Sequence, residues 1–216
     1  MPRFLMLAPV AVAALALSAC ATRPYTGPVE VTRFVAPNPD GLGQGPIVVY
    51  FPDEVSNANA KAAIRAAVES ELRALGYTVV AQEGRGIQVA AVRTTRQAVP
   101  AQVGNQRGGV NVGVGGGVGG GFGGGGFGGV GVGIDLGSLG GGREGPSANT
   151  ELSVRITNDA TATLWEGRAQ LATGVKSPYS EVNTSARTLA AGLFRNFPGG
   201  NGETVTINVK KLQGSK

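Results

Sequence analysis

"ELSVRITNDATATLWEGRAQLA", residues 151–172, decides the fold, because apolar and polar side chains alternate on both sides of a polar centre. The apolar positions share one face of each half: Leu152, Val154 and Ile156, then Trp165, Gly167, Ala169 and Leu171. A period of two is typical of a half-buried strand, and Asn158-Asp159 supplies turn residues that tolerate positive φ. We therefore predict a β-hairpin that buries this apolar face.

A helix is predicted on the N-terminal side of the hairpin, in "SNANAKAAIRAAVESELRALGY", residues 56–77. Its apolar stripe recurs every three or four residues: Ile64, Val68, Leu72 and Leu75. Ser56, Asn57 or Asn59 can cap its start, and Gly76 stands where a left-handed C-terminal cap belongs.

A second helix is predicted after the hairpin, opened by Ser177-Pro178 and stopped by Pro198. Its apolar stripe is Val182, Ala186, Leu189, Leu193 and Phe197. Alternating or continuous apolar runs predict five further strands: 29–35, 47–51, 77–81, 86–94 and 204–209. The expected fold is α+β, with a mostly antiparallel sheet packed on two helices and a glycine-rich hairpin or flap inserted into it.

The N-terminus, "MPRFLMLAPVAVAALALSAC", has the layout of a secretory signal peptide over residues 1–19, with Arg3 ahead of an apolar run. The small residues before Cys20 resemble the bacterial lipoprotein signal, which implies cleavage after residue 19 and a diacylglyceryl, palmitate-type anchor on Cys20. The apolar run is shorter than the ~20 residues needed to span a bilayer, which disfavours a transmembrane helix. Lipid attachment at Cys20 is therefore predicted.

We expect residues 20–45 to form a lipidated, flexible leader and residues 46–216 to form a single domain. Ala21 is not the aspartate typical of lipoproteins retained in the inner membrane of enteric bacteria, so this analogy favours the periplasmic face of the outer membrane. The formal net charge is +5, but Lys and Arg are scattered, which indicates a solvated surface. Without a basic cluster, nucleic acid is not expected as a partner.

A resemblance to a known family rests on three pieces of the chain. They are "AAIRAAVESELRALGY", "LSVRITNDATATLWEGRAQ" after the glycine-rich stretch, and "LFRNFP". Together they resemble the bacterial lipoprotein family known only as domain of unknown function 4136, over about residues 48–198. The resemblance implies a fold and an envelope location. It carries no catalytic or ligand-binding residues.

The residues that most enzymes need are scarce in this chain. It has no histidine, and its one cysteine is assigned to lipid. This composition excludes Ser-His and Cys-His nucleophiles and nearly every zinc or transition-metal site. We predict no enzymatic activity, no cofactor, and no catalytic, cofactor-binding or metal-binding residue.

Two pairs of acids that lie close together in the sequence leave a carboxylate-based hydrolase of cell-wall glycan open as an alternative: Asp53 with Glu54, and Glu69 with Glu71. Asp135 and Asp159 could contribute to a hard-cation site, although no dense acidic loop supports calcium binding. Trp165, the only tryptophan, lies either in a binding site or in the core under the second helix. Its parity within the strand favours the core.

The glycine-rich insertion, at about residues 104–146, contains "VNVGVGGGVGGGFGGGGFGGVGVGIDLG". Apolar residues alternate at 110–114 and again at 130–136, which predicts two weak strands around a loose tip. Strand addition through this flap, with Phe122 and Phe127 exposed, would bind a protein partner or a second copy of the chain.

The composition of the insertion is compatible with other structures. Self-assembly would make the protein adhesin-like, while glycines at every fourth position from Gly113 to Gly145 would suit a glycine-zipper membrane helix. Against the helix, each glycine costs about 1 kcal/mol of helix propensity relative to alanine. Gly115, Gly117 and Gly120 match a dinucleotide fingerprint, but no helix is predicted to follow, so nucleotide binding is not expected.

Overall fold

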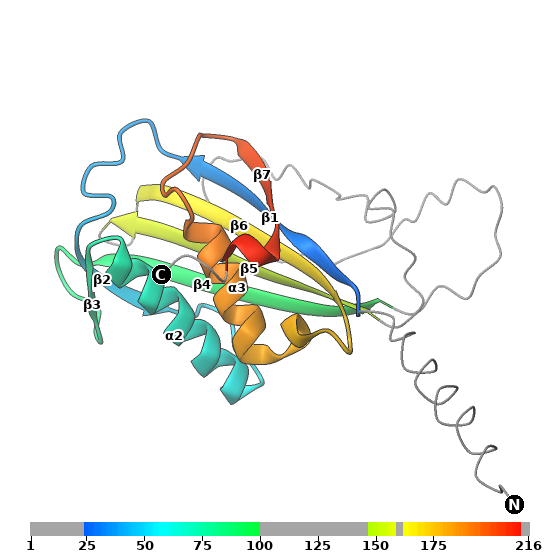
Figure 1. The fold of residues 1–216 in the computed structure, drawn as a ribbon. Helices are drawn as coiled ribbons and strands as arrows, with labels where there is room; N and C mark the ends of the chain where they lie inside the picture. Colours follow the sequence, from blue (N-terminus) through cyan, green and yellow to red (C-terminus); the bar gives the residue numbers. More distant parts are fainter. Residues whose placement is uncertain (1–23, 100–146, 159–161, 213–216) are drawn as a thin grey trace, which may run out of the picture.

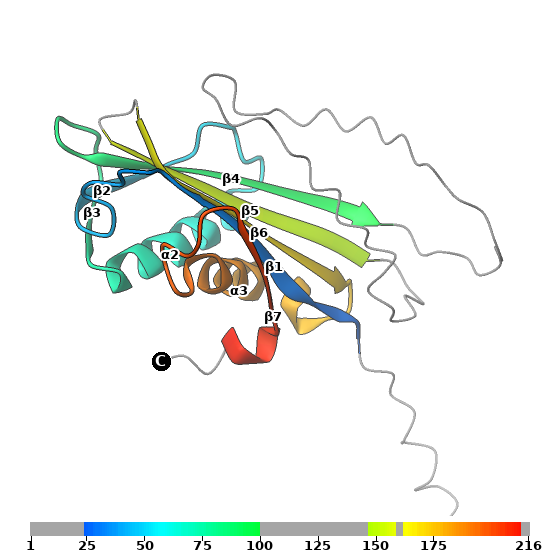
Figure 2. The ribbon, with the colours of Figure 1, turned by 90° about the horizontal axis from the view of Figure 1, so that it is seen from above.

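The computed structural model describes residues 24–99, 147–158 and 162–212, which form one seven-stranded sheet with two helices on one face (Figures 1 and 2). The strands are β1 (Thr26–Val35), β2 (Gly45–Tyr50), β3 (Tyr77–Val80), β4 (Gln88–Val99), β5 (Ser147–Asn158), β6 (Ala162–Gly174) and β7 (Glu203–Ile207). The helices are α2 (Ala58–Ala74) and α3 (Val182–Phe194), with short 3-10 turns η2 (Pro178–Ser180) and η3 (Val209–Leu212).

The order of the strands is β3-β2-β4-β5-β6-β1-β7. β2 runs parallel to β3, because α2 carries the chain back between them, and parallel to β4, because residues 81–87 carry the chain back again. Every other pairing is antiparallel. The predicted α+β class, with a mostly antiparallel sheet on two helices, is therefore confirmed. No helix in the described ranges is long and apolar enough to cross a membrane.

The predicted hairpin is the β5–β6 pair at the centre of the sheet. Its apolar residues face the helices and are buried, with Leu152, Val154 and Trp165 at most 1% exposed. On the other face, Arg155 forms an ion pair with Glu166 across the strands at 3.0 Å. The alternation in the sequence thus predicted both faces correctly.

The leader boundary at residue 45 is wrong. β1, which contains the strand predicted at 29–35, lies inside the sheet between β6 and β7. Val29 and Val31 are fully buried. The domain therefore begins by Thr26, because this strand supplies a ladder and core side chains that the sheet would otherwise lack.

α2 agrees with its prediction. Asn57 is the cap that the structure selects, since its Oδ1 accepts a hydrogen bond from the Ala60 N–H at 3.0 Å. Gly76 has φ of +106°, a conformation that side chains rarely adopt. Ile64, Val68 and Leu72 are buried against the sheet and α3.

α3 is shorter at both ends than predicted. Ser177-Pro178 belongs to η2, and the N-cap of α3 is Glu181, whose carboxylate accepts hydrogen bonds from the N–H groups of Asn183 and Thr184. The helix ends at Phe194, so Phe197 packs on the core from outside the helix. The side-chain cap and the turn that follows Phe194 decide these ends.

Arg33 is a buried cation that binds the end of α3. Strand alternation points it inward with the valines of β1, and its side chain is 2% exposed. Its Nε donates to the Leu193 carbonyl oxygen at 3.0 Å, and its Nη2 donates to those of Gly192 at 3.1 Å and Arg195 at 2.8 Å. Burial lowers the pKa of this guanidinium, while the charge of Glu203 acts in the opposite direction. Arg33 thus pairs carbonyls that a helix end leaves without partners.

Four strand ends meet at one end of the sheet, which we call the Thr26 end. Thr26 lies beside Thr173, Thr173 beside Ala148, and Ala148 beside Ala98. β4 and β5 are paired as far as Val99 and Ser147, so the chain enters and leaves residues 100–146 at this end. The predicted glycine-rich flap itself lies outside the described residues, as do Cys20 and the signal peptide.

Candidate functional site

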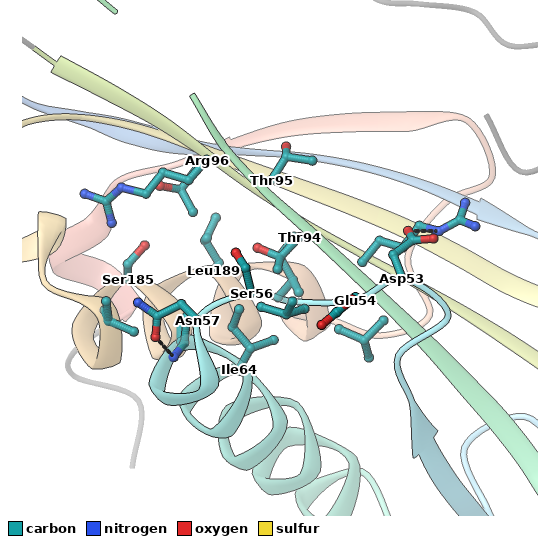
Figure 3. A pocket seen from close by; sticks show the side chains of 18 residues that line it. Asp53, Glu54, Ser56, Asn57, Ile64, Thr94, Thr95, Arg96, Ser185 and Leu189 are labelled. Atoms are coloured by element: carbon teal, nitrogen blue, oxygen red, sulfur yellow. Dashed lines mark hydrogen bonds and ion pairs between the residues drawn. The ribbon is translucent and has the colours of Figure 1, made fainter. Parts of the chain in front are cut away.

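A cavity of about 340 Å³ lies between the two helices and the sheet, where both helices begin (Figure 3). It is bounded by the β2–α2 loop, the first turns of α2, the middle of β4 and β5, and the start of α3. Its lining comprises Asp53–Asn57, Ala60, Ile64, Val92–Arg96, Thr150, Leu152, Val182, Ser185, Ala186 and Leu189.

The floor of the cavity is apolar. Ile64, Val92, Leu152 and Leu189 come from four different elements and are all buried. Ile64, Leu152 and Leu189 were expected to face the core, because they fall on the predicted apolar face of a strand or helix, whereas no face was predicted for Val92. An apolar floor of this kind suits an apolar side chain of a ligand rather than a charged one.

The acids at the rim are adjacent residues of the β2–α2 loop. Asp53 forms an ion pair with Arg93 of β4, with 2.8 Å between Oδ2 and Nε, although its side chain is 63% exposed. Glu54 follows it on the same loop. The pair therefore does not flank a bond from opposite sides, the geometry that acid-and-base hydrolysis of a glycan needs.

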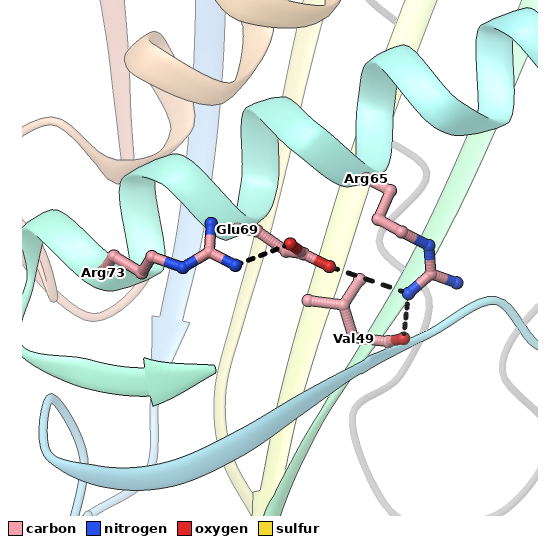
Figure 4. Close-up of polar contacts among 4 residues, drawn as sticks. All are labelled: Val49, Arg65, Glu69 and Arg73. Carbon is pink, nitrogen blue, oxygen red and sulfur yellow. Dashed lines mark hydrogen bonds and ion pairs between the residues drawn. The ribbon is translucent and has the colours of Figure 1, made fainter. Parts of the chain in front are cut away.

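The acids on α2 lie elsewhere, and neither lines the cavity. Glu69 lies between two arginines of its own helix, 3.8 Å from Arg65 and 2.8 Å from Arg73 (Figure 4). Arg65 also donates to the Val49 carbonyl oxygen at 2.8 Å and thereby ties α2 to β2. Burial raises the pKa of the Glu71 carboxyl. The structure thus does not bring the two acid pairs into one site.

Arg96 is the cation at the opposite side of the cavity from Glu54 (Figure 3). It is exposed, and its guanidinium donates to the Ser180 carbonyl oxygen at 3.0 Å and to the Ser180 Oγ at 2.8 Å. Both acceptors are neutral, so these bonds position the charge without cancelling it. No sequence pattern predicted this contact, because Ser180 lies 84 positions further along the chain.

The edge of β4 next to the cavity is open along the part of the chain that the structure describes. β2 pairs with β4 only as far as Ala91, whereas β4 continues to Val99 with β5 on its other side. Thr95–Ala98 are all exposed. The strand was predicted to end at Thr94, so this extension was missed. An open strand edge presents N–H and C=O groups to which another extended chain can bind.

Trp165 is a core residue, and its interpretation as a binding-site residue is wrong. Its side chain is fully buried, and its ring stacks on that of Phe194 with centroids 5.5 Å apart. The ring of Phe197 is tilted against that of Trp165, with 5.1 Å between the two centroids. These contacts place it under α3, as strand parity predicted.

Metal ligands are not grouped within the described ranges: no three of the His, Cys, Asp and Glu side chains there lie close enough to hold an ion. Asp135 and Asp159, considered for a hard cation, lie outside those ranges. The cavity contributes only two carboxylates, and one of them is paired with Arg93. These lining residues suit a neutral or zwitterionic ligand better than a metal ion.

Comparison with known proteins adds little. No family model and no curated protein matches the chain. A PDZ domain protein from Parabacteroides distasonis is similar at 13% identity and a TM-score of 0.47, over 85% of this chain but 38% of that one. The PelC dodecamer from Paraburkholderia phytofirmans is similar in two crystal structures at 12% identity, with TM-scores of 0.35 and 0.36. These two matches cover 76% of this chain and 92% and 93% of the respective PelC chains. This chain therefore spans about 38% of the length of the PDZ domain protein, and TM-scores this low show neither a shared fold nor a shared function.

Proposed function

We propose that the protein is a lipid-anchored protein of the bacterial cell envelope that binds a protein partner and catalyses no reaction. The anchor is the acylated Cys20, on the periplasmic face of the outer membrane. The signal-like N-terminus and the resemblance to the domain of unknown function 4136 family support this location. Two or three acyl chains hold a small domain at a bilayer without a spanning helix.

The observation that carries the binding role is the open edge of β4 beside the cavity. A partner strand added along this edge gains main-chain hydrogen bonds, while its alternate side chains point toward the cavity. The glycine-rich insertion, at about residues 104–146, follows β4 in the sequence and is part of the proposed contact. Self-association through this edge is the second candidate, since a copy of the chain offers the same backbone groups.

The non-enzymatic part of the proposal rests on the sequence and on the rim of the cavity. Histidine is absent from the whole chain. Asp53 is engaged with Arg93, and Glu54 shares its loop. These groups suit the stabilisation of a loop and a strand better than proton transfer.

Site-specific photocrosslinking in living cells tests the contact. A crosslinking amino acid at Gln97, on the open edge, is expected to capture a protein partner, whereas the same residue at the exposed Asp40, at the opposite end of the sheet, is not. Removal of 115–129 is expected to weaken the capture. Equal capture at both positions, or capture unchanged by the deletion, would contradict the proposed surface.

The alternatives give different results. A self-assembling, adhesin-like protein gives crosslinks between copies of this chain and binds amyloid dyes. A glycine-zipper membrane helix keeps a Cys20→Ala variant in the membrane fraction. A glycan hydrolase releases fragments from purified peptidoglycan and loses this activity on Asp53→Asn.

A further inference from the structure

The end of the sheet from which a lipid tether would run also carries a fixed, exposed turn, which we call the 174–177 turn. It joins β6 to η2 and lies directly beside the first described residues of β1. The Gly174 N–H donates to the Tyr25 carbonyl oxygen at 2.9 Å, and the hydroxyls of Thr26 and Ser177 are 2.6 Å apart. The turn is therefore held in place at the point where the tether joins the domain.

The length of the tether limits where the domain lies. Thr26 follows Cys20 by six residues, which span about 20 Å at most when fully extended. β6 has 13 residues, a length of about 40 Å, and finishes at the Thr26 end, so its first residues lie about 40 Å from that end. An acylated Cys20 would hold the Thr26 end close to the headgroups, and the opposite end would lie well beyond the reach of the tether if the sheet stands upright.

The side chains of this turn suit a lipid surface. Val175 is 52% exposed and is one of three large apolar side chains in the described ranges with such exposure. Lys176 is exposed next to it, and Arg96 adds a second exposed cation at this end through its bonds to Ser180 in η2. Glu181 is the nearby acid, and its carboxylate is bound by N–H groups at the start of α3. An apolar tip flanked by cations inserts at the boundary between headgroups and acyl chains.

We infer that the 174–177 turn is a second membrane contact, in which Val175 enters the bilayer interface and Lys176 binds anionic headgroups. The inference rests on the proposed anchoring at Cys20. It orients the domain with its sheet upright, so that β4 ends and β5 begins on the membrane side. The partner for this turn is the lipid surface itself.

Fluorescent labels on the anchored chain test the orientation. Acylation occupies the thiol of Cys20, the one cysteine, so an introduced cysteine is labelled alone. Val175→Cys, and Asp40→Cys as the control at the opposite end, are labelled with a polarity-sensitive dye in vesicles of phosphatidylethanolamine and phosphatidylglycerol. The dye at 175 is expected to shift to the blue and to be quenched severalfold more by spin-labelled lipid than the dye at 40.

A charge reversal supplies the second measurement. Lys176→Glu is expected to reduce the quenching at 175 in anionic vesicles, whereas Arg85→Glu, an exposed change in the β3–β4 loop, leaves it unchanged. Equal quenching at 175 and 40 in chains that float with the vesicles overturns the inference but not the anchor. Failure of the wild-type chain to float, as for Cys20→Ala, overturns the anchor and the inference together.

Discussion

Trp165 of β6 donates its indole N–H to the carbonyl oxygen of Pro198, at 2.9 Å, across the end of α3. The ring of the only tryptophan in the chain thus stacks on Phe194, while its indole nitrogen donates to the turn that follows α3. One residue of the central hairpin thereby fixes the position at which the helix layer closes over the sheet.

Trp165→Phe is expected to lower the free energy of unfolding by about 1–3 kcal/mol, because the smaller ring leaves space and the Pro198 carbonyl loses its donor. Urea unfolding followed by circular dichroism measures this, since the variant lacks the tryptophan fluorescence. Tyr50→Phe is the control, because Tyr50 is 46% exposed. Equal midpoints for both variants would contradict the role of Trp165.

Arg33→Met is expected to destabilise the domain by roughly 3 kcal/mol, because three carbonyls at the end of α3 lose a charged donor. Arg33→Lys recovers only part of the loss, since an ammonium cannot reproduce the guanidinium fork. Arg85→Met, at an exposed loop position, is the matched control and leaves the unfolding midpoint unchanged. A wild-type midpoint for Arg33→Met would refute the interpretation of Arg33 as the residue that caps α3.

Gly167→Ala is expected to cost about 1–3 kcal/mol of folding free energy through overpacking. A β-carbon at this inward position of β6 would collide with the Trp165 ring and lie 2.8 Å from Cδ1 of Leu193. Gly174→Ala is the control, because its nearest neighbours would be at an ordinary 3.5 Å. Thermal unfolding of the two variants compares them, and a larger loss at Gly174 would contradict the packing.

The lowered pKa of the Glu181 carboxyl predicts that the domain loses stability in acid. Hydrogen bonds from the N–H groups of Asn183 and Thr184 lower its pKa from 4.5 to about 2. Since the folded-state pKa lies below the unfolded one, the stabilisation is present above about pH 4.5 and is lost as the pH falls toward 2. Glu181→Gln is expected to lower the unfolding midpoint at pH 7 and to flatten its change between pH 5 and pH 2.

Glu71 is expected to change the stability with pH in the opposite direction to Glu181. Burial raises the pKa of its carboxyl, so folding favours the protonated form and the stabilisation falls as the pH rises through the folded-state pKa. Glu71→Gln is therefore expected to raise the unfolding midpoint at pH 7, with a smaller gain below pH 4. A fall at pH 7 for Glu71→Gln would show that its charged form makes a favourable contact.

Local patterns predicted much of the fold because their causes are local. The buried faces of β5 and β6 follow from alternation along each strand, and the ends of α2 follow from Asn57 and Gly76. The parity of "VEVTRFV" places Arg33 inward as well, so the sequence held the signal for this buried cation. Its partners at the end of α3 lie about 160 positions away, so the alternation along β1 could not predict which groups Arg33 binds.

The candidate site depended on the tertiary structure. The sequence named Asp53 as an acid, but only the packing of β4 against the β2–α2 loop pairs it with Arg93. The cavity exists because two helices begin over the same part of the sheet, and the edge of β4 is open because β2 ends at Tyr50. These properties depend on how far one segment extends beside another. The sequence of a single segment does not determine that relationship.

By itself, the sequence therefore determined the fold class, the buried faces of the hairpin and of α2, the glycine that ends α2 and the scarcity of catalytic groups, since each depends on composition or on neighbours within a few residues. Tertiary structure alone decided that β1 lies inside the sheet, that Arg33 binds α3, and that Thr26, Ala98 and Ala148 share one end. The physical reason is that strand order and register are set by pairing between distant segments, whose hydrogen bonds and buried area appear only when the whole sheet forms.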